Sequence, residues 1–375
     1  MSEFAIACDP LADHGNEGLS PAIALAMAGA RLGREDAEAL YFRASLPTLG
    51  LLAMHARMRR HPQPVVTYVG DRNINYSNVC VCQCRFCAFY RKPGDPESYV
   101  ISRAEMAAKI EELFRLGGTQ ILLQGGHHPD LPFGWYLELL AWMRQQWPSL
   151  HIHAFSPPEI QYWSRKFGIS VREIIARLMA AGLDSIPGGG AEILQDDARR
   201  RVSPNKCSAR EWLEVMETAH SLGMRTTATM MFGHEEQPGH RLDHLFALRD
   251  LQDRTGGFTA FIPWTFQPGN TDIDARPLPA PAYLRLLAIS RLVLDNIDNI
   301  QASWVTMGPE IAQLALSYGA NDFGSLMIEE NVVAAAGVSY RMSRADINAV
   351  IRAAGFVPRQ RLMDYSLIEA RESAE

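Results

Sequence analysis

The middle of the chain switches repeatedly between short apolar runs and longer amphipathic segments. The apolar runs are rich in β-branched and aromatic residues and cover 73–79, 119–124, 151–156, 183–187, 225–232, 258–264 and 301–306. Runs of this length and composition predict buried strands. Strands that alternate with helices predict a parallel β/α fold. Seven such strands, with an eighth expected near 321–325, favour an α/β fold of the (β/α)8 TIM-barrel type over an open sheet.

The amphipathic segments between these runs carry helix start and stop signals. Three of them begin with Ser-x-x-Glu and close at a glycine. The serine can accept a hydrogen bond from a free N–H of the first turn, and the glutamate can reach back to the cap residue. The closing glycine adopts the left-handed conformation that ends a helix. The pairs are Ser102/Glu105, Ser170/Glu173 and Ser208/Glu211, with stops at Gly117, Gly182 and Gly223.

The two ends of the chain lack this alternation. We expect residues 1–70 to form a helical N-terminal extension and residues 71–310 to form the barrel core. Residues 311–375 should form a C-terminal, mostly helical extension packed on the barrel, because Ser343-x-x-Asp346 opens another helical pattern that closes at Gly355. The chain therefore reads as one barrel with two additions.

Composition narrows the class of protein. Hydrophobic residues make up 47% and charged residues 21% of the 375 residues, and the formal net charge is -6. These values are ordinary for a soluble globular protein and do not indicate a nucleic-acid partner. The N-terminal segment lacks a basic region followed by an apolar one, and no apolar run approaches the ~20 residues that span a bilayer. We expect a cytoplasmic protein with no membrane partner.

Four of the six cysteines lie within eight residues, at the end of the first expected strand. Cys80, Cys84 and Cys87 have the spacing Cys-x3-Cys-x2-Cys. A structural zinc site normally needs four ligands, commonly in two separated pairs, and the sequence offers no second pair. Three thiolates on one loop instead suit a [4Fe–4S] cluster that keeps one iron open. The fourth, Cys82, is expected to pack as a small side chain, with a spare ligand or an oxidation-sensitive thiol as the alternative.

This loop, with Phe86 directly before the last cysteine, resembles that of the radical S-adenosylmethionine (SAM) enzymes. The resemblance implies a [4Fe–4S] cluster bound by Cys80, Cys84 and Cys87, and SAM bound at the open iron. It also implies SAM contacts from Phe86 in this loop and from residues at other strand ends. The latter are Gln124, Gly125, Gly126, Glu192 and, in the segment MFGHEE that lines the adenine pocket in this family, Glu236.

Further candidate residues follow other expected strands, at the barrel end where active sites lie. His128 follows Gly125–Gly126, whereas His153 and Glu159 lie in HIHAFSPPEI. Imidazole and carboxylate groups are the usual proton acceptors in enzymes, so all three are candidate catalytic residues, and Glu192 remains open as a fourth. A structural histidine is the alternative for His153. The segment 261–268, FIPWTFQP, is either an aromatic wall for a flat substrate or ordinary core.

Within the radical SAM enzymes, the stretches QGGHHPD, GGGAEIL and IPWTFQP most resemble the cyclases of the futalosine route to menaquinone. This resemblance implies dehypoxanthine futalosine as substrate, C4′ hydrogen abstraction followed by attack on the benzoate ring, and an electron donor such as flavodoxin or ferredoxin. The alternatives in the same family are aminofutalosine synthase and the radical SAM subunit of deazaflavin (FO) synthase. From other classes, a zinc-dependent barrel hydrolase and an iron–sulfur electron carrier remain.

Overall fold

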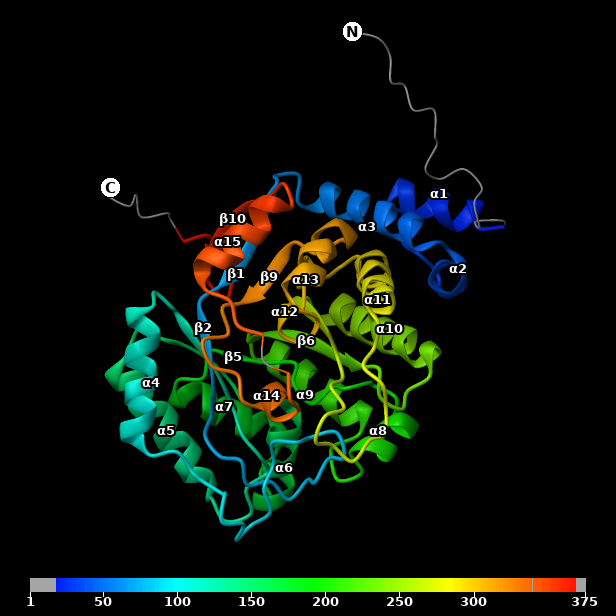
Figure 1. Ribbon diagram of the computed structural model, residues 1–375. Coiled ribbons are helices and arrows are strands. Elements are labelled where there is room, and N and C mark those ends of the chain that lie inside the picture. Colours follow the sequence, from blue (N-terminus) through cyan, green and yellow to red (C-terminus); the bar gives the residue numbers. More distant parts are fainter. Residues whose placement is uncertain (1–17, 339, 369–375) are drawn as a thin grey trace, which may run out of the picture.

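The computed structural model describes residues 18–338 and 340–368, and the strands lie at its centre (Figure 1). The strands are β1 (Val65–Val69), β2 (Asp71–Asn75), β3 (Gln120–Gln124), β4 (His151–Ala154), β5 (Ser185–Ile186), β6 (Arg225–Phe232), β7 (Phe258–Thr265), β8 (Asn299–Ile300), β9 (Asp322–Ser325) and β10 (Val357–Arg361).

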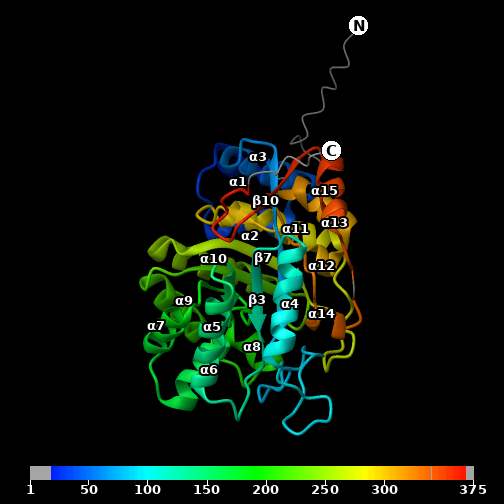
Figure 2. The same ribbon diagram turned by 90° about the vertical axis from the view of Figure 1, so that its left-hand side faces the viewer.

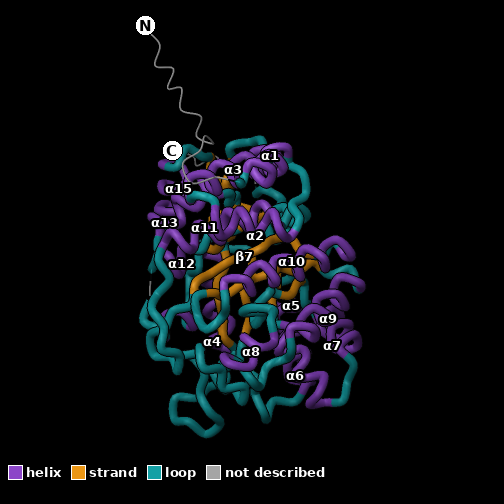
Figure 3. The backbone as a smooth tube through the Cα atoms, turned by 90° about the vertical axis from the view of Figure 1, so that its right-hand side faces the viewer, coloured by secondary structure: helices purple, strands orange, loops and turns teal. Residues whose placement is uncertain are grey.

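Helices surround the strands, as the view from the side shows (Figure 3). They are α1 (Ser20–Ala28), α2 (Arg34–Arg43), α3 (Leu46–Arg60), α4 (Arg103–Arg115), α5 (Phe133–Gln146), α6 (Pro157–Phe167), α7 (Val171–Ala181), α8 (Asp196–Val202), α9 (Ala209–Ser221), α10 (Pro238–Thr255), α11 (Ala280–Val293), α12 (Trp304–Met307), α13 (Pro309–Ala315), the 3-10 turn η1 (Leu316–Tyr318), α14 (Val332–Ala335) and α15 (Arg344–Ala353).

The strands form a ring, which confirms the TIM-type barrel. Strands β2 to β8 pair in chain order as a seven-stranded parallel sheet, and β10-β1-β9 form a second parallel sheet. Only Gly70 separates β1 from β2, so the two act as one long strand with a break. At the other side, Gln301 pairs with Asp322 next to β8, and the Ala302 N–H donates to the Asp322 carbonyl at 2.8 Å. The eighth strand of the barrel is therefore β9, which closes the ring between β8 and β1.

The helix signals in the sequence correspond to real caps. Ser102 caps α4, Ser170 caps α7, Ser208 caps α9 and Ser343 caps α15, each by accepting a hydrogen bond from the N–H three residues on. Gly182 at the end of α7 has a φ of 115°, in the left-handed region that glycine tolerates. These local signals were sufficient because each cap is made within one turn of chain.

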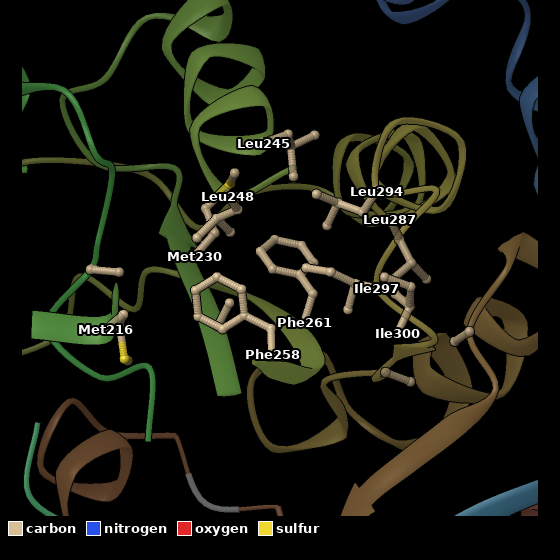
Figure 4. Packing of buried hydrophobic residues seen from close by; sticks show 14 of the residues in the cluster. Met216, Met230, Leu245, Leu248, Phe258, Phe261, Leu287, Leu294, Ile297 and Ile300 are labelled. Atoms are coloured by element: carbon tan, nitrogen blue, oxygen red, sulfur yellow. The ribbon is translucent and has the colours of Figure 1, made fainter. Parts of the chain in front are cut away.

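Apolar side chains fill the layer between the barrel and its outer helices. Met230 of β6 and Phe261 of β7 point toward Leu245 and Leu248 of α10 (Figure 4), and all four are fully buried. Along β7 the alternate positions Ala260, Ile262 and Trp264 instead line a cavity inside the barrel. This alternation is the two-residue period of a strand, and it assigns one face to the core and the other to the cavity.

Two expectations about strands were wrong or incomplete. The run 301–306 was expected to be a strand, but β8 ends at Ile300 and helix α12 begins at Trp304. A short apolar run has no period that distinguishes the two structures. The strands β1 and β10 were not predicted, and β1 lies in the segment expected to be helical. β10 reads Val-Pro-Arg-Gln-Arg, a polar sequence at the edge of its sheet, where it pairs with β1 and, at its end, with Leu367.

The two ends of the barrel differ in what covers them. Helices α1 to α3 and α15 lie at one end, and the long loop after β2, coloured from blue to cyan, projects at the opposite end (Figures 1 and 2). The loop follows the carboxyl end of β2 and all strands of the sheet are parallel. The cysteines therefore lie at the end of the barrel where active sites are built.

Candidate active site at the carboxyl ends of the strands

The cysteine loop is held in a defined shape by backbone pairing. Val79 pairs with Arg91, and the Cys80 N–H donates to the Arg91 carbonyl at 3.0 Å. The Cys80 sulfur in turn accepts two backbone N–H groups, from Cys82 at 3.4 Å and from His127 at 3.3 Å. Donors aimed at a sulfur stabilise its thiolate form, which is the form that binds metal.

The thiols themselves are sheltered from water. Burial raises the pKa of Cys80 and of Cys87. The pKa of Cys84 lies well above its ordinary value, first because it donates a hydrogen bond to the Cys82 sulfur and second because of burial. Thiolates in such a place need a nearby positive charge. A metal cluster supplies one, so this donor set suits a buried iron–sulfur group.

Cys82 packs inside the loop beside its neighbour. Its side chain is 1% exposed, and its sulfur lies 3.6 Å from that of Cys84. Its carbonyl accepts a hydrogen bond from Asn205 at 3.1 Å. The small packed side chain expected from the sequence is compatible with this position, and the contact with Cys84 keeps the alternative of a reactive thiol open.

The Gly125–Gly126 turn is pressed against the cysteine loop. A Cβ on Gly126 would lie 2.2 Å from the Val79 carbonyl oxygen and 2.6 Å from the Cys80 Cβ, and one on Gly125 would meet the ring of Tyr76. Both positions therefore require glycine. This turn and the cysteine loop form one tightly packed unit.

Glu159 accepts hydrogen bonds from residues of this unit. One carboxylate oxygen accepts from the Tyr76 hydroxyl at 2.7 Å and from the Gly125 N–H at 3.3 Å. The other accepts from the N–H and the hydroxyl of Ser156, both at 2.7 Å, as the cap of α6. Burial raises the pKa of Glu159. Its oxygens are engaged with the protein, so the geometry gives it a supporting position rather than an open one.

Glu192 pairs with Lys206, a residue that the sequence analysis did not single out. Lys206 donates to its carboxylate at 2.8 Å and lies 4.8 Å from the centre of the Phe86 ring. The pKa of Glu192 is lowered despite burial, because Lys206 and Arg199 are close. Lys206 also faces the Cys84 thiol. No motif marks a lone lysine, and only folding brings it to Phe86 and Glu192.

Glu236 closes the turn after β6. Its carboxylate accepts from the N–H groups of Gly233 at 2.7 Å and His234 at 2.9 Å, and it pairs with Arg241 at 2.6 Å. Neighbouring His234 and Arg241 lower its pKa against the effect of burial. Glu236 therefore fixes the shape of the segment that the sequence analysis assigned to an adenine pocket.

A cavity of about 260 Å³ runs inside the barrel. Gln124 and Gly189 line it, near the glycine turn and the cysteine loop, and Trp264 lines it from β7. Polar residues line it from the strands and from the segments that follow them: Asp71, Asn73, Gln120, His153, Thr227, Thr229, Gln301, Ser303, Thr306, Ser325, Glu330, Arg361 and Tyr365. A mostly apolar cavity with a few polar groups is the usual form of a small-molecule site. Of the aromatic residues expected to form a wall, Trp264 lines the cavity, whereas Phe261 belongs to the hydrophobic core.

The three candidate proton acceptors lie in different places. His153 lines the cavity. His128 uses Nδ1 to accept the N–H groups of Asp130 at 3.1 Å and Leu131 at 3.3 Å, and it does not line this cavity. Glu159 is engaged as described above. Burial lowers the pKa of His153 well below its ordinary value, so its imidazole is neutral and one ring nitrogen carries a lone pair.

Two amide oxygens that line the cavity have no hydrogen-bond partner in the described part of the chain. They are Oδ1 of Asn73 and Oε1 of Gln120, on side chains 5% and 3% exposed. A buried acceptor without a partner is costly, and a hydroxyl or amide of a bound molecule would satisfy each. Arg361, the guanidinium that lines the cavity, is already paired with Asp322 at 2.5 Å. These groups come from residues that no sequence motif marked.

No group of three His, Cys, Asp or Glu side chains in the described residues converges on a point that a single metal ion would occupy. A [4Fe–4S] cluster does not require such convergence, because each cysteine binds a different iron. The N–H groups aimed at Cys80, the absence of a Cβ at Gly126 and the buried thiols are compatible with a cluster in this loop.

Comparison with known proteins decides the family. A family model described as "Radical SAM superfamily" matches residues 74–248, and one described as "CofH/MqnC C-terminal region" matches residues 255–374. The chain is 46% identical to the cyclic dehypoxanthine futalosine synthase of Halalkalibacterium halodurans, over 93% of this chain and 95% of that protein.

This chain belongs to the radical SAM superfamily. A radical SAM enzyme uses a [4Fe–4S] cluster and SAM, so the expected cofactors are confirmed at this level. A second cyclic dehypoxanthine futalosine synthase, from Streptomyces coelicolor, is also 46% identical, over 92% of this chain and 88% of that protein. The aminodeoxyfutalosine synthase of Thermus thermophilus is 39% identical, over 92% and 94%.

Solved structures of proteins with low sequence identity to this chain share its fold. The hydrogenase maturase HydG from Carboxydothermus hydrogenoformans aligns with a TM-score of 0.71 at 15% identity, over 93% of this chain and 81% of that one. Methylornithine synthase aligns with a TM-score of 0.67 at 17% identity, over 90% and 97%. At such identities the likeness establishes the barrel alone. Among the described residues no helix is long and apolar enough to span a bilayer.

Proposed function

We propose that this radical SAM enzyme converts dehypoxanthine futalosine to its cyclic product, a step of menaquinone biosynthesis. The observation that carries the proposal is the 46% identity to two cyclic dehypoxanthine futalosine synthases over nearly the full length of all three proteins. The aminodeoxyfutalosine synthase is 39% identical over a similar span. The FO synthase of Mycobacterium leprae is 42% identical, but the match covers 36% of that protein.

Cys80, Cys84 and Cys87 would hold the cluster. The spacing of these residues and the N–H groups donated to Cys80 support this ligand set. When bound, the cluster and SAM supply the carbon-centred radical that removes a hydrogen atom from the substrate. Gln124, Gly125 and Gly126 would contact SAM from the β3 turn. Phe86, Glu192 and Glu236 would contact it from the loops around β2, β5 and β6, where Glu192 and Glu236 are already held by Lys206 and Arg241.

The residues of the cavity would position the flexible substrate. C4′ of the sugar and the benzoate ring must be held in contact for the ring to be attacked. Trp264 and Ile262 offer an apolar wall for the ring. The free oxygens of Asn73 and Gln120 would accept hydrogen bonds from sugar hydroxyls. His153, which lines the same cavity, would accept the proton that the ring loses.

The proposal extends to the electron donor, the other partners and the location of the enzyme. An electron donor such as flavodoxin or ferredoxin would reduce the cluster. The net charge of -6 gives no reason to expect a nucleic-acid partner, and we propose a cytoplasmic enzyme without a membrane partner. Residues 1–70 and 311–375 would be extensions of a core at 71–310, each contributing a strand, β1 and β9, to the closed ring.

The test is a reaction under anaerobic conditions. The reconstituted protein is mixed with SAM, dithionite and dehypoxanthine futalosine, and mass spectrometry follows 5′-deoxyadenosine and a product two hydrogen atoms lighter than the substrate. Both species are expected. 5′-Deoxyadenosine without that product would retain radical SAM chemistry and refute the substrate, and the aminodeoxyfutalosine synthase substrate would then be the next one to test. Neither species, from a protein with a full cluster, would refute the proposal altogether.

A further inference from the structure

Three hydrogen-bonded side chains run from the cavity wall toward the amino-terminal end of the barrel. Nδ1 of His153 lies 2.6 Å from Oγ of Ser185, and the same Oγ lies 2.7 Å from Nε2 of His151. His153 and Ser185 are 5% and 2% exposed, whereas His151 is partly exposed. This row of hydrogen bonds therefore connects the buried imidazole of His153 at the cavity to the partly exposed imidazole of His151.

The barrel geometry accounts for this alignment. His151 and His153 are two residues apart on β4, so both point to the inner face of the barrel. Ser185 of β5 is in register with His153. Its hydroxyl thus lies between the two rings, where it can accept a hydrogen bond from one and donate to the other.

We propose that His153, Ser185 and His151 form a proton relay that carries the proton lost by the substrate ring out of the cavity. The proposal rests on the cyclisation described above. After C4′ bonds to the ring, the adduct radical regains aromaticity by losing one electron and one proton. The electron passes to a one-electron acceptor of the iron–sulfur class, and the C–H bond electrons stay in the ring. The proton goes to Nε2 of His153, the ring nitrogen that Ser185 leaves free.

The transfer then needs no movement of heavy atoms. In the tautomer with a proton on Nδ1, His153 passes that proton to the Ser185 oxygen, and the Ser185 hydroxyl passes its own proton to Nε2 of His151. His151 then releases the proton from Nδ1 to water. Each step forms one bond to hydrogen and breaks another along a hydrogen bond shorter than 2.8 Å.

Charges around the two rings favour this direction. His153 is fully enclosed, and both His151 and Arg361 of β10 disfavour its protonated form. Burial lowers the pKa of His151 too, and Arg144 of α5 adds to this effect, but Asp184 before β5 and Asp364 after β10 favour the protonated form of His151 and offset part of the shift. A proton on the relay is therefore more stable at the outer ring than at the inner one.

Two variants test the relay: one removes the Ser185 hydroxyl between the two rings, and the other removes the outer imidazole, His151. In Ser185→Ala, we expect the yield of cyclic product per 5′-deoxyadenosine to fall by roughly 10²-fold, the usual contribution of a general base. His151→Gln, which keeps a hydrogen-bonding group but cannot pass a proton on, should show the same loss. Ser185→Thr restores the hydroxyl and should restore most of the product.

A matched control separates the relay from general effects of losing a buried histidine. His220 also bridges two hydroxyl groups, of Thr226 and Thr255, each at 2.7 Å, and burial lowers its pKa to about 4. It does not line the cavity. In His220→Gln, the ratio of product to 5′-deoxyadenosine should therefore equal that of the wild type.

A second readout needs no catalysis. With ¹⁵N-labelled histidine in the cluster-free protein, Ser185→Ala should change the tautomer and titration of His151 and His153 together and leave His220 unchanged. The relay is overturned if Ser185→Ala lowers product and 5′-deoxyadenosine by the same factor, if it changes neither, or if Ser185→Thr fails to restore product. If the wild type itself makes no cyclic product, the proposed function fails instead.

Discussion

Side chains of one type have different surroundings within the cysteine loop. Cys80 receives two backbone N–H groups, and Cys84 meets Lys206, whereas Cys82 is enclosed by the loop and touches Cys84. Lys206 also interacts with Cys82, so the features that distinguish Cys82 are its 1% exposure and its position outside the family spacing. The geometry is compatible with a packing role for Cys82.

Single substitutions test this division of roles. After anaerobic reconstitution, Cys84→Ala is expected to lose most of the bound iron, since one iron then lacks a protein ligand. Cys82→Ser is expected to keep about four irons per chain, because serine fills the same space without offering a thiolate. Iron and sulfide analysis measures both. Loss of the cluster in Cys82→Ser would identify Cys82 as a ligand.

The turn after β3 shows what an element contributes beyond its residues. Gly126 lets the turn lie against Val79 and Cys80, and Glu159 at the start of α6 holds Gly125 through its N–H. A strand end, a helix cap and the cysteine loop therefore form a single unit. A change that displaces the turn must displace the loop as well.

Two glycine substitutions separate this effect from a change in overall stability. Gly126→Ala would place a methyl group 2.2 Å from the backbone oxygen of Val79, so we expect the reconstituted protein to hold much less iron. Gly134→Ala lies in α5, where a Cβ meets nothing within 4 Å. There alanine favours the helix, by up to ~1 kcal/mol, and iron loading should be unchanged. Equal iron in the two variants would contradict the packing argument.

Closure of the ring is a property of the whole molecule. Asp71 of β2 accepts a hydrogen bond from Ser325 of β9, although the two residues are 254 positions apart, and Gln120 of β3 donates to its other oxygen at 3.5 Å. Asp322 and Arg361 pair in the same region. Buried polar groups thus join the first strands to the last.

This junction should make stability depend on pH. Burial raises the pKa of Asp71 to about 6, above its value of about 4 in an unfolded chain. The protonated form therefore stabilises the fold below pH 4, and this contribution is lost as the pH rises through about 6. A difference of about two pKa units corresponds to roughly 3 kcal/mol.

The comparison variant is Asp71→Asn, which keeps an acceptor for Ser325 and offers an N–H₂ to the free oxygen of Gln120. Relative to the wild type, its unfolding midpoint should rise by about 4 °C between pH 4 and pH 7 for a chain of this length. Thermal unfolding followed by circular dichroism measures the difference. A constant offset between the two proteins across this range would show that Asp71 does not titrate in it.

The sequence by itself determined what depends on neighbouring residues. Strand β6 was predicted at its observed bounds, the serine caps of α4 and α9 were found from their spacing, and the cysteine spacing indicated the family. These signals suffice because a cap or a strand pattern is satisfied within a few residues.

Only the tertiary structure decided which distant groups meet. The partners of Glu159 and Glu192, the position of His153 on the cavity, and the closure of the ring by β9 all depend on contacts between separate segments. No local sequence pattern predicts such contacts. Lys206 meets Phe86, and Ser185 lies between two histidines, only because the fold brings separate segments together. The fold class and the family were therefore readable from the sequence, whereas the arrangement of the site was not.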